Sequence, residues 1–219
     1  IADCVEWLSF TYLFRRLVMN PSFYQLSSTE PTAMEEYLTA LLDGVVKDLQ
    51  KAGCVEVEDD FYLRSSLRGD TACAYYLDYK TVERIDNTLH RWRLEFESTG
   101  PGPTLEDVVR LLSDVFEFAE LPVRHNEELL NAELSEKLPW GVPLDQMISP
   151  HAKTFLLLQA HFFRVALPIS DYRTDTKSVL DQAPRVLMAM IDLAAAAGMR
   201  SVVLTCIEMG QMIFQASDP

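Results

Sequence analysis

Apolar residues recur at three- and four-residue steps through most of this 219-residue chain, and this spacing predicts a mainly α-helical protein. A helix over residues 32–52 illustrates the pattern, with an apolar face formed by Leu38, Leu41, Leu42, Val45, Val46 and Leu49. Further helices are predicted over residues 5–19, 69–77, 79–93, 104–118, 123–138, 149–166, 174–197 and 200–216. A chain of this length can bury the core of one or two domains.

One segment departs from the helical pattern. Residues 54–57 and 61–63 are short alternating runs on either side of an acidic turn, Glu58-Asp59-Asp60. Such runs around a polar turn predict an antiparallel hairpin. Two helices followed by a two-stranded hairpin indicate a winged-helix unit with a small wing.

Turn and cap residues divide the chain further. Gly100-Pro101-Gly102-Pro103 predicts a linker. We therefore expect a winged-helix portion with connecting helices over 1–98, a helical bundle over 104–170, and a long helix with a helix–loop–helix over 171–219. Thr104 and the Ser149-Pro150 pair are typical helix starts, and Thr174 or Asp175 is expected to cap the long helix. Pro184 lies inside that helix and is expected to kink it.

The net charge of −14 argues against broad binding to phosphate or to anionic lipid. The charge is uneven, because residues 1–104 hold 17 acids and 10 bases whereas residues 150–219 hold six of each. Only this last third could approach a nucleic-acid backbone without strong repulsion.

Cysteine usage and hydropathy bear on location. Cys4, Cys54, Cys73 and Cys206 are widely spaced and form no C-x-x-C pair, which predicts reduced thiols and an intracellular protein, nuclear or cytoplasmic. The longest apolar stretches are too short to span a membrane. The chain opens on Ile1 without an initiator Met, so we expect a piece of a longer polypeptide.

Motifs for catalysis are missing from the sequence. It contains no G-x-x-x-x-G-K-[S/T] for a nucleotide and no G-x-S-x-G nucleophile turn. His151 and His161 are about 15 Å apart along one predicted helix and cannot share a metal. We therefore expect no catalytic residue, no metal site and no bound cofactor in this chain.

The most suggestive polar segment is the start of the long predicted helix. It carries hydroxyl, amide and cationic side chains with few acids, namely Thr174, Thr176, Lys177, Ser178, Gln182 and Arg185. Such side chains suit contact with the sugar–phosphate of a single strand. They suit helix capping and packing against a neighbouring domain equally well.

Several unbroken strings carry a family resemblance. They are FRRLVMNPSFY (14–24), YYLDYKTV (75–82), LLSDVFEFAELPVRHNEELLN (111–131), SPHAKTFLLLQAHFFR (149–164) and DYRTDTKSVLDQAPRVLMAMIDLAA (171–195). Together they resemble the winged helix and the following Sec-sixty-three homology region of large superfamily-two (DExH-type) helicases. The segments DTKSVLDQA and LPVRHNE are most similar to the C-terminal cassette of the cointegrator-complex branch, and the spliceosomal branch is also similar.

The resemblance implies a fold and a role. The fold is a winged helix with a two-stranded wing, then a multi-helix bundle and a helix–loop–helix. The region would pack on the helicase motor domains of the same polypeptide, which would hold ATP and Mg. A long helix of the bundle would lie along single-stranded RNA or DNA, and Thr174, Lys177, Gln182 and Arg185 match that helix. Arg124 and Asn126, with His125 between them, are a second candidate contact for the strand or the motor.

Two alternatives stay open. An acidic helical surface suits a protein-interaction scaffold that docks other subunits of a helicase-containing complex. The homologous region of an endoplasmic-reticulum translocation subunit is a weaker alternative, because the winged-helix portion disfavours it.

Overall fold

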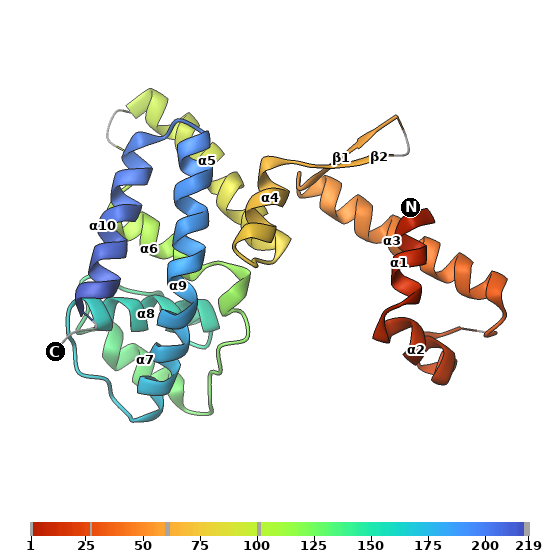
Figure 1. The fold of residues 1–219 in the computed structure, drawn as a ribbon. Coiled ribbons are helices and arrows are strands. Elements are labelled where there is room, and N and C mark those ends of the chain that lie inside the picture. The colour runs from red at the N-terminus through yellow and green to blue at the C-terminus, as the bar shows by residue number, and fades with distance from the viewer. Residues whose placement is uncertain (1, 27, 60–61, 100–101, 217–219) are drawn as a thin grey trace. The chain divides into compact units, whose positions relative to one another are not determined.

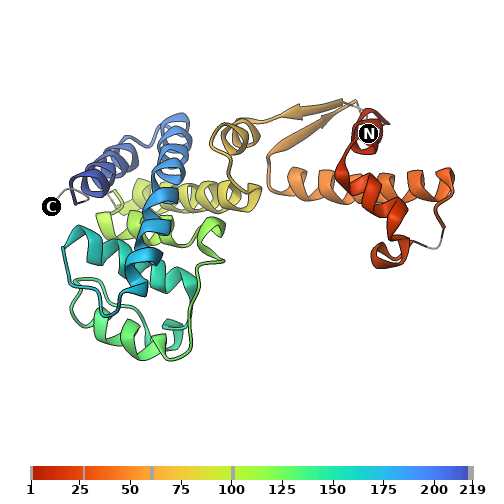
Figure 2. The same ribbon diagram turned by 60° about the horizontal axis from the view of Figure 1, so that its bottom comes forward.

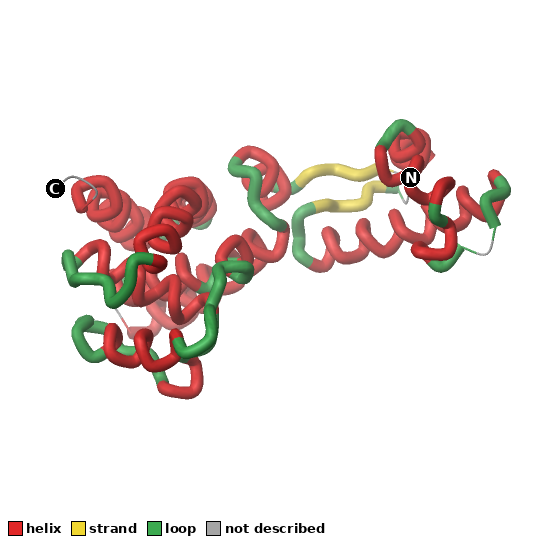
Figure 3. The backbone as a smooth tube through the Cα atoms, turned by 90° about the horizontal axis from the view of Figure 1, so that it is seen from below, coloured by secondary structure: helices red, strands yellow, loops and turns green. Residues whose placement is uncertain are grey.

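The computed structural model describes residues 2–26, 28–59, 62–99 and 102–216. Compact packing divides the chain after Ser66, into a first unit of residues 1–66 and a second unit of residues 67–219. The described residues are mostly helical, with one two-stranded antiparallel sheet (Figure 3). This confirms the predicted fold class, a mainly α protein with a small two-stranded wing.

The first unit contains three α-helices, a 3₁₀ turn and the hairpin among its described residues. Its elements are α1 (Ala2–Ser9), α2 (Tyr12–Met19), η1 (Pro21–Tyr24), α3 (Pro31–Lys51), β1 (Val55–Glu58) and β2 (Tyr62–Ser65). The strands pair with Val55 opposite Ser65 and Glu58 opposite Tyr62. Glu58 therefore ends a strand, whereas Asp60 and Phe61 of the expected turn and strand lie outside the described residues. Leu17, Met34 and Leu38 form a small buried core.

The single helix predicted over residues 5–19 is wrong, because the chain breaks between α1 and α2. Thr11 has an extended backbone, with φ −89° and ψ 165°. Its hydroxyl donates to the Leu8 carbonyl at 2.6 Å, and the Ser9 hydroxyl donates to the Glu6 carbonyl at 2.6 Å. Short hydroxyl side chains that bond nearby carbonyls compete with the helical ladder, which accounts for the break.

The second unit is a bundle built around one buried helix (Figures 1 and 2). Its elements are α4 (Leu67–Ala74), α5 (Tyr79–Thr99), α6 (Leu105–Ser113), η2 (Phe116–Phe118), α7 (Glu127–Ser135), η3 (Leu144–Gln146), α8 (Pro150–Phe162), α9 (Asp171–Ala196) and α10 (Arg200–Ala216). Residues 152–160 of α8 are all buried, because α6, α7, α9 and α10 pack around them. Helices α9 and α10 lie side by side (Figure 1).

The boundary between the units differs from the regions expected from the sequence. Residues 67–98 belong to the second unit, because α4 and α5 pack against α9. The expected linker lies inside that unit, where Pro103 is buried and a Cβ on Gly102 would come within 2.6 Å of the Ser201 hydroxyl oxygen. Gly100 and Pro101 lie outside the described residues.

Helix α9 begins earlier than the sequence predicts. Ser170 is its N-cap residue, so Thr174 and Asp175 lie within the helix rather than capping it. The negative charge of Asp171 in the first turn interacts favourably with the positive end of the helix dipole. Burial of Tyr172 fixes this turn against the bundle. Pro184 lies inside α9 without ending it. The Thr104 cap is confirmed, since its hydroxyl accepts from the Asp107 amide in a capping box.

Candidate nucleic-acid interface

Helix α9 has one polar side and one buried side. The buried side is the expected core face, with Val179, Val186, Met190 and Leu193. The polar side carries Thr174, Lys177, Ser178, Asp181, Gln182 and Arg185 at three- and four-residue steps, and we call these six residues the α9 polar face. Thr174 and Lys177 are exposed, whereas Gln182 and Arg185 are half-buried. The structure thus places all four α9 candidates on one side of the helix.

Arg185 ties the α9 polar face to the turn that follows α4. Its guanidinium donates to the main-chain carbonyls of Tyr75, at 3.2 Å, and Tyr76. Its Nε also donates to Oε1 of Gln182 at 2.8 Å. A second tie joins the same segments, because the Tyr75 hydroxyl donates to the Asp192 carboxylate at 2.5 Å and this hydrogen bond raises the pKa of Tyr75. Arg185 therefore has a structural role as well as a candidate binding role.

Tyr76 is a functional candidate that the sequence analysis missed. Its side chain is 90% exposed, and its backbone has a positive φ of 55°. A bulky residue in the left-handed region is strained, and such outliers gather at functional sites. Its main-chain carbonyl accepts from Arg185, so the backbone of Tyr76 lies beside the α9 polar face. The run of aromatics in YYLDY (75–79) was the available signal.

Arg124 lies against the first two turns of α9. Its guanidinium forms two hydrogen bonds with the Asp175 carboxylate, at 2.7 and 3.1 Å, and one with Glu127 at 2.9 Å. Asp171 lies 3.7 Å away. These carboxylates already satisfy Arg124, so its first role is to fix the start of α9. Asn126, in the left-handed conformation before α7, is exposed and makes no side-chain capping bond.

Lys153 lies at the centre of the same cluster and was also missed. Its side chain is fully buried, and Nζ donates to Glu127 at 2.6 Å, to Asp175 at 2.7 Å and to the Pro122 carbonyl at 2.7 Å. The ammonium also lies 4.6 Å from the centre of the Tyr172 ring. A lysine in the first turn of a largely apolar helix was the available signal, because a buried charge needs partners.

The cations determine the protonation of this cluster. Burial alone would raise the pKa of Glu127 and of Asp175, but hydrogen bonds from Lys153 and Arg124 outweigh burial and lower both. Burial and the two carboxylates raise the pKa of the Tyr172 hydroxyl. Glu127 and Asp175 are therefore ionised carboxylates at neutral pH.

Further polar contacts extend the cluster from α9 to α7 and to the end of η3. The Tyr172 hydroxyl donates to the Asn131 side-chain oxygen at 2.7 Å, and the Asn131 amide donates to the Met147 carbonyl at 2.8 Å. Because these bonds join α7, α9 and the segment that precedes α8, they position these elements relative to one another. Among the described residues, no group of three or more His, Cys, Asp and Glu side chains could hold a metal ion.

The fold and the site together define a winged-helix unit followed by a helical bundle with a long, polar-faced helix. The chain belongs to the Sec63 Brl domain family, which matches residues 66–217. A Winged Helix-turn-helix domain family matches residues 1–59. Both matches confirm the resemblance found in the sequence.

The curated relatives carry helicase or complex-subunit names. The chain is 42% identical to DExH-box ATP-dependent RNA helicase DExH14 of Arabidopsis thaliana and 39% identical to activating signal cointegrator 1 complex subunit 3 of Homo sapiens, over 97% of this chain and 9% of each relative. It is 37% identical to RQC trigger complex helicase SLH1 of Saccharomyces cerevisiae, over 97% of this chain and 11% of that protein. The chain thus spans about a tenth of these relatives. No described helix is long and apolar enough for a membrane span.

Proposed function

We propose that this chain is a non-catalytic accessory region of an ATP-dependent RNA or DNA helicase of the nucleus or cytoplasm. It packs on the motor domains of the same polypeptide and guides the translocating single strand along α9. The observation that carries the proposal is the α9 polar face, where Lys177 is exposed and forms no ion pair within the described residues. The helicase names of the relatives support the parent activity.

The contacts that fix α9 in the bundle favour its role as a strand guide. The Lys153 and Arg124 cluster fixes its first turns, and Arg185 and Asp192 fix its second half to the Tyr75–Tyr76 turn. A rigid helix keeps its polar side chains at constant spacing as a strand moves past. Exposed hydroxyls and one lysine bind phosphate weakly, which suits a strand that must slide.

The first unit supplies the surface for packing on a motor. Four aromatic side chains on α1, α2, η1 and the turn between α1 and α2 are between 68% and 83% exposed, namely Trp7, Phe10, Tyr12 and Phe23. The buried core of this unit has only a few residues. A group of exposed aromatic side chains on one small unit is typical of a protein interface. We propose that the motor domains of the parent polypeptide cover it.

Strand binding is testable with the chain itself. A fluorescein-labelled single-stranded oligouridine should bind weakly, and its affinity should fall as salt rises from about 50 to about 200 mM. Lys177→Ala should weaken binding severalfold and reduce the salt slope by about 1, as expected for one lost phosphate contact. Arg200→Ala, which removes an exposed cation of α10, is the matched control. Equal losses in both variants, or binding that ignores salt, would contradict the proposal.

A second candidate function is a docking scaffold for other subunits of the helicase-containing complex. The outer side of α7 favours it, since Glu128, Glu133 and Glu136 are exposed there around Leu129, which is 70% exposed. Acidic side chains around an apolar residue suit a basic partner. Pull-down from cell extract with the unmodified chain and with Glu128→Lys/Glu133→Lys tests this. Recovery of the same proteins by both would count against docking on α7.

A further inference from the structure

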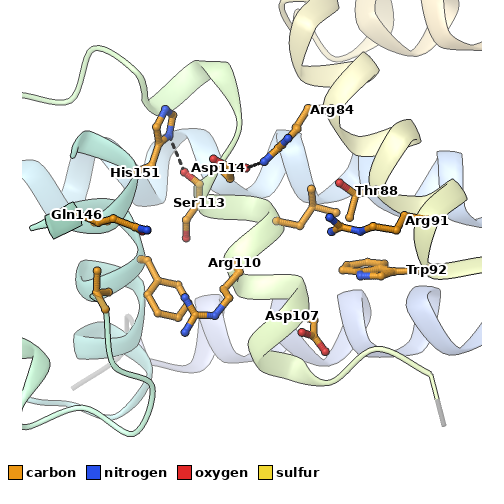
Figure 4. Close-up of a pocket in the computed structure, with 14 residues that line it drawn as sticks. Arg84, Thr88, Arg91, Trp92, Asp107, Arg110, Ser113, Asp114, Gln146 and His151 are labelled. Carbon is orange, nitrogen blue, oxygen red and sulfur yellow. Dashed lines mark hydrogen bonds and ion pairs between the residues drawn. The ribbon is translucent and has the colours of Figure 1, made fainter. Parts of the chain in front are cut away.

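A cavity of about 310 Å³ lies in the second unit, away from the α9 polar face. Residues of α5, α6 and α8 line it, together with Val142 and Gln146 of the segment between α7 and α8 (Figure 4). None of its lining residues comes from α9. A cavity of this size accommodates one or two side chains or a small ligand.

The charge of the lining is opposite to that of the protein. Three arginines, Arg84, Arg91 and Arg110, line the cavity with two aspartates, whereas the chain as a whole carries −14. Both aspartates already have partners. Asp114 is paired with Arg84, and Asp107 accepts from the Thr104 amide at 2.9 Å and from its hydroxyl at 2.7 Å. The cavity therefore has one more arginine than it has carboxylates.

Arg110 is fixed in position by its own contacts. Its guanidinium pairs with Glu106 at 2.7 Å and donates to the Gly141 carbonyl at 3.1 Å. It also lies over the Phe155 ring, 4.3 Å from the centroid. This arrangement makes a flat, positively charged wall beside an aromatic ring.

Arg91 is the arginine whose guanidinium N–H groups donate no hydrogen bond within the described residues. Within the described residues its Nε lies 3.9 Å from Oε1 of Glu95, which is beyond hydrogen-bond distance, and its side chain is 64% exposed. Figure 4 shows Arg91 reaching into the cavity beside Thr88, with the Gln146 side chain pointing in from the opposite side. Neither the Thr88 hydroxyl nor the Gln146 amide has a hydrogen-bond partner within the described residues. Three polar groups thus converge on one space.

We propose that this cavity binds a carboxylate side chain in an acidic segment of a partner protein. A guanidinium donates two parallel hydrogen bonds to a carboxylate, and Thr88 and Gln146 add further donors. A neighbouring apolar side chain of the segment packs on Val142, which is half-buried. A phosphate carries a larger negative charge and is repelled more strongly by Asp107 and Asp114. The single charge of a carboxylate therefore fits the cavity better. This site is independent of strand binding on α9.

The test uses the whole chain and two capped peptides, acetyl-Gly-Leu-Glu-Phe-Gly-amide and its counterpart with Gln in place of Glu. Binding is followed by NMR through the indole N–H of Trp92, which lines the cavity and is assigned with Trp92→Phe. The glutamate peptide should shift this signal saturably. The glutamine peptide should bind at least roughly fivefold more weakly, as expected when a charged hydrogen-bond pair is lost.

Two arginine variants distinguish peptide binding in the cavity from nonspecific electrostatic attraction. Arg91→Gln should weaken the glutamate peptide at least roughly fivefold, whereas Arg200→Gln, an equal change of charge on α10, should leave it unchanged. No saturable shift, or equal binding by Arg91→Gln, would overturn the proposal. Inorganic phosphate or adenosine monophosphate that binds the cavity more tightly than the glutamate peptide would overturn the assignment to a carboxylate.

Discussion

Lys153 of α8 lies with its ammonium 2.7 Å from the Asp175 carboxylate of α9, and both side chains are almost completely buried. This contact joins the central helix of the bundle to the helix that we propose guides the strand. A buried ion pair often adds little net stability, but removal of one partner leaves an uncompensated charge. The pair therefore serves chiefly to fix the position of α9.

Loss of the Lys153 charge should destabilise the second unit strongly. Lys153→Met keeps an unbranched side chain one atom shorter and leaves Glu127 and Asp175 with Arg124 as their remaining cation. The expected cost is about 3–5 kcal/mol. Urea unfolding of a Trp7→Phe background measures it, because the remaining tryptophans, Trp92 and Trp140, belong to the second unit.

Lys137→Met is the control for that experiment, since Lys137 is exposed on the same unit. It should change the free energy of unfolding by less than about 0.5 kcal/mol. Equal stability of the Lys153→Met and Lys137→Met variants would contradict a fixing role for the cluster.

The same cluster predicts how stability depends on pH. The pKa values of Glu127 and Asp175 are lower in the folded protein than in the unfolded chain. The unfolded chain therefore binds more protons at acidic pH, and the stabilisation is complete above the unfolded pKa values of about 4. It should be lost as pH falls through the folded values. The urea midpoint of the Trp7→Phe protein should thus fall between about pH 5 and about pH 3, and a constant midpoint would contradict the charged cluster.

Gly102 should tolerate no side chain. A Cβ there would lie 2.7 Å from Cβ and 2.6 Å from Oγ of Ser201. Gly102→Ala should cost about 1–3 kcal/mol, because the connection to α6 must shift away from α10. Adding Ser201→Gly removes both clashing atoms and should restore most of the loss. Thermal unfolding of the two variants measures this, and an unimpaired Gly102→Ala protein would show that this connection is free of α10.

Local sequence signals predicted the elements well where the determinants are local. The helix starting at Thr104 follows from its capping box, and the hairpin follows from alternation around an acidic turn. The break between α1 and α2 depends on hydrogen bonds from the hydroxyls of Ser9 and Thr11. The spacing of apolar residues gives no sign of these bonds.

Long-range contacts limited the prediction of the site. Lys153 meets Glu127 and Asp175, which are 26 and 22 residues away, so only the packed bundle brings the charges together. The sequence identified Arg124 as a polar candidate but could not place it against Asp175. Tyr76 likewise becomes notable only when its exposure, its positive φ and its contact with Arg185 are known together.

The path of the strand is tested most directly by photocrosslinking. Single-stranded RNA containing 4-thiouridine would be irradiated with the full chain, and the modified peptides mapped by mass spectrometry. Crosslinks should concentrate on Tyr76 and on residues 174–185 of α9, and they should decrease with Lys177→Ala. Crosslinks confined to the first unit or to α10, with none on α9 or Tyr76, would contradict a strand-guiding α9.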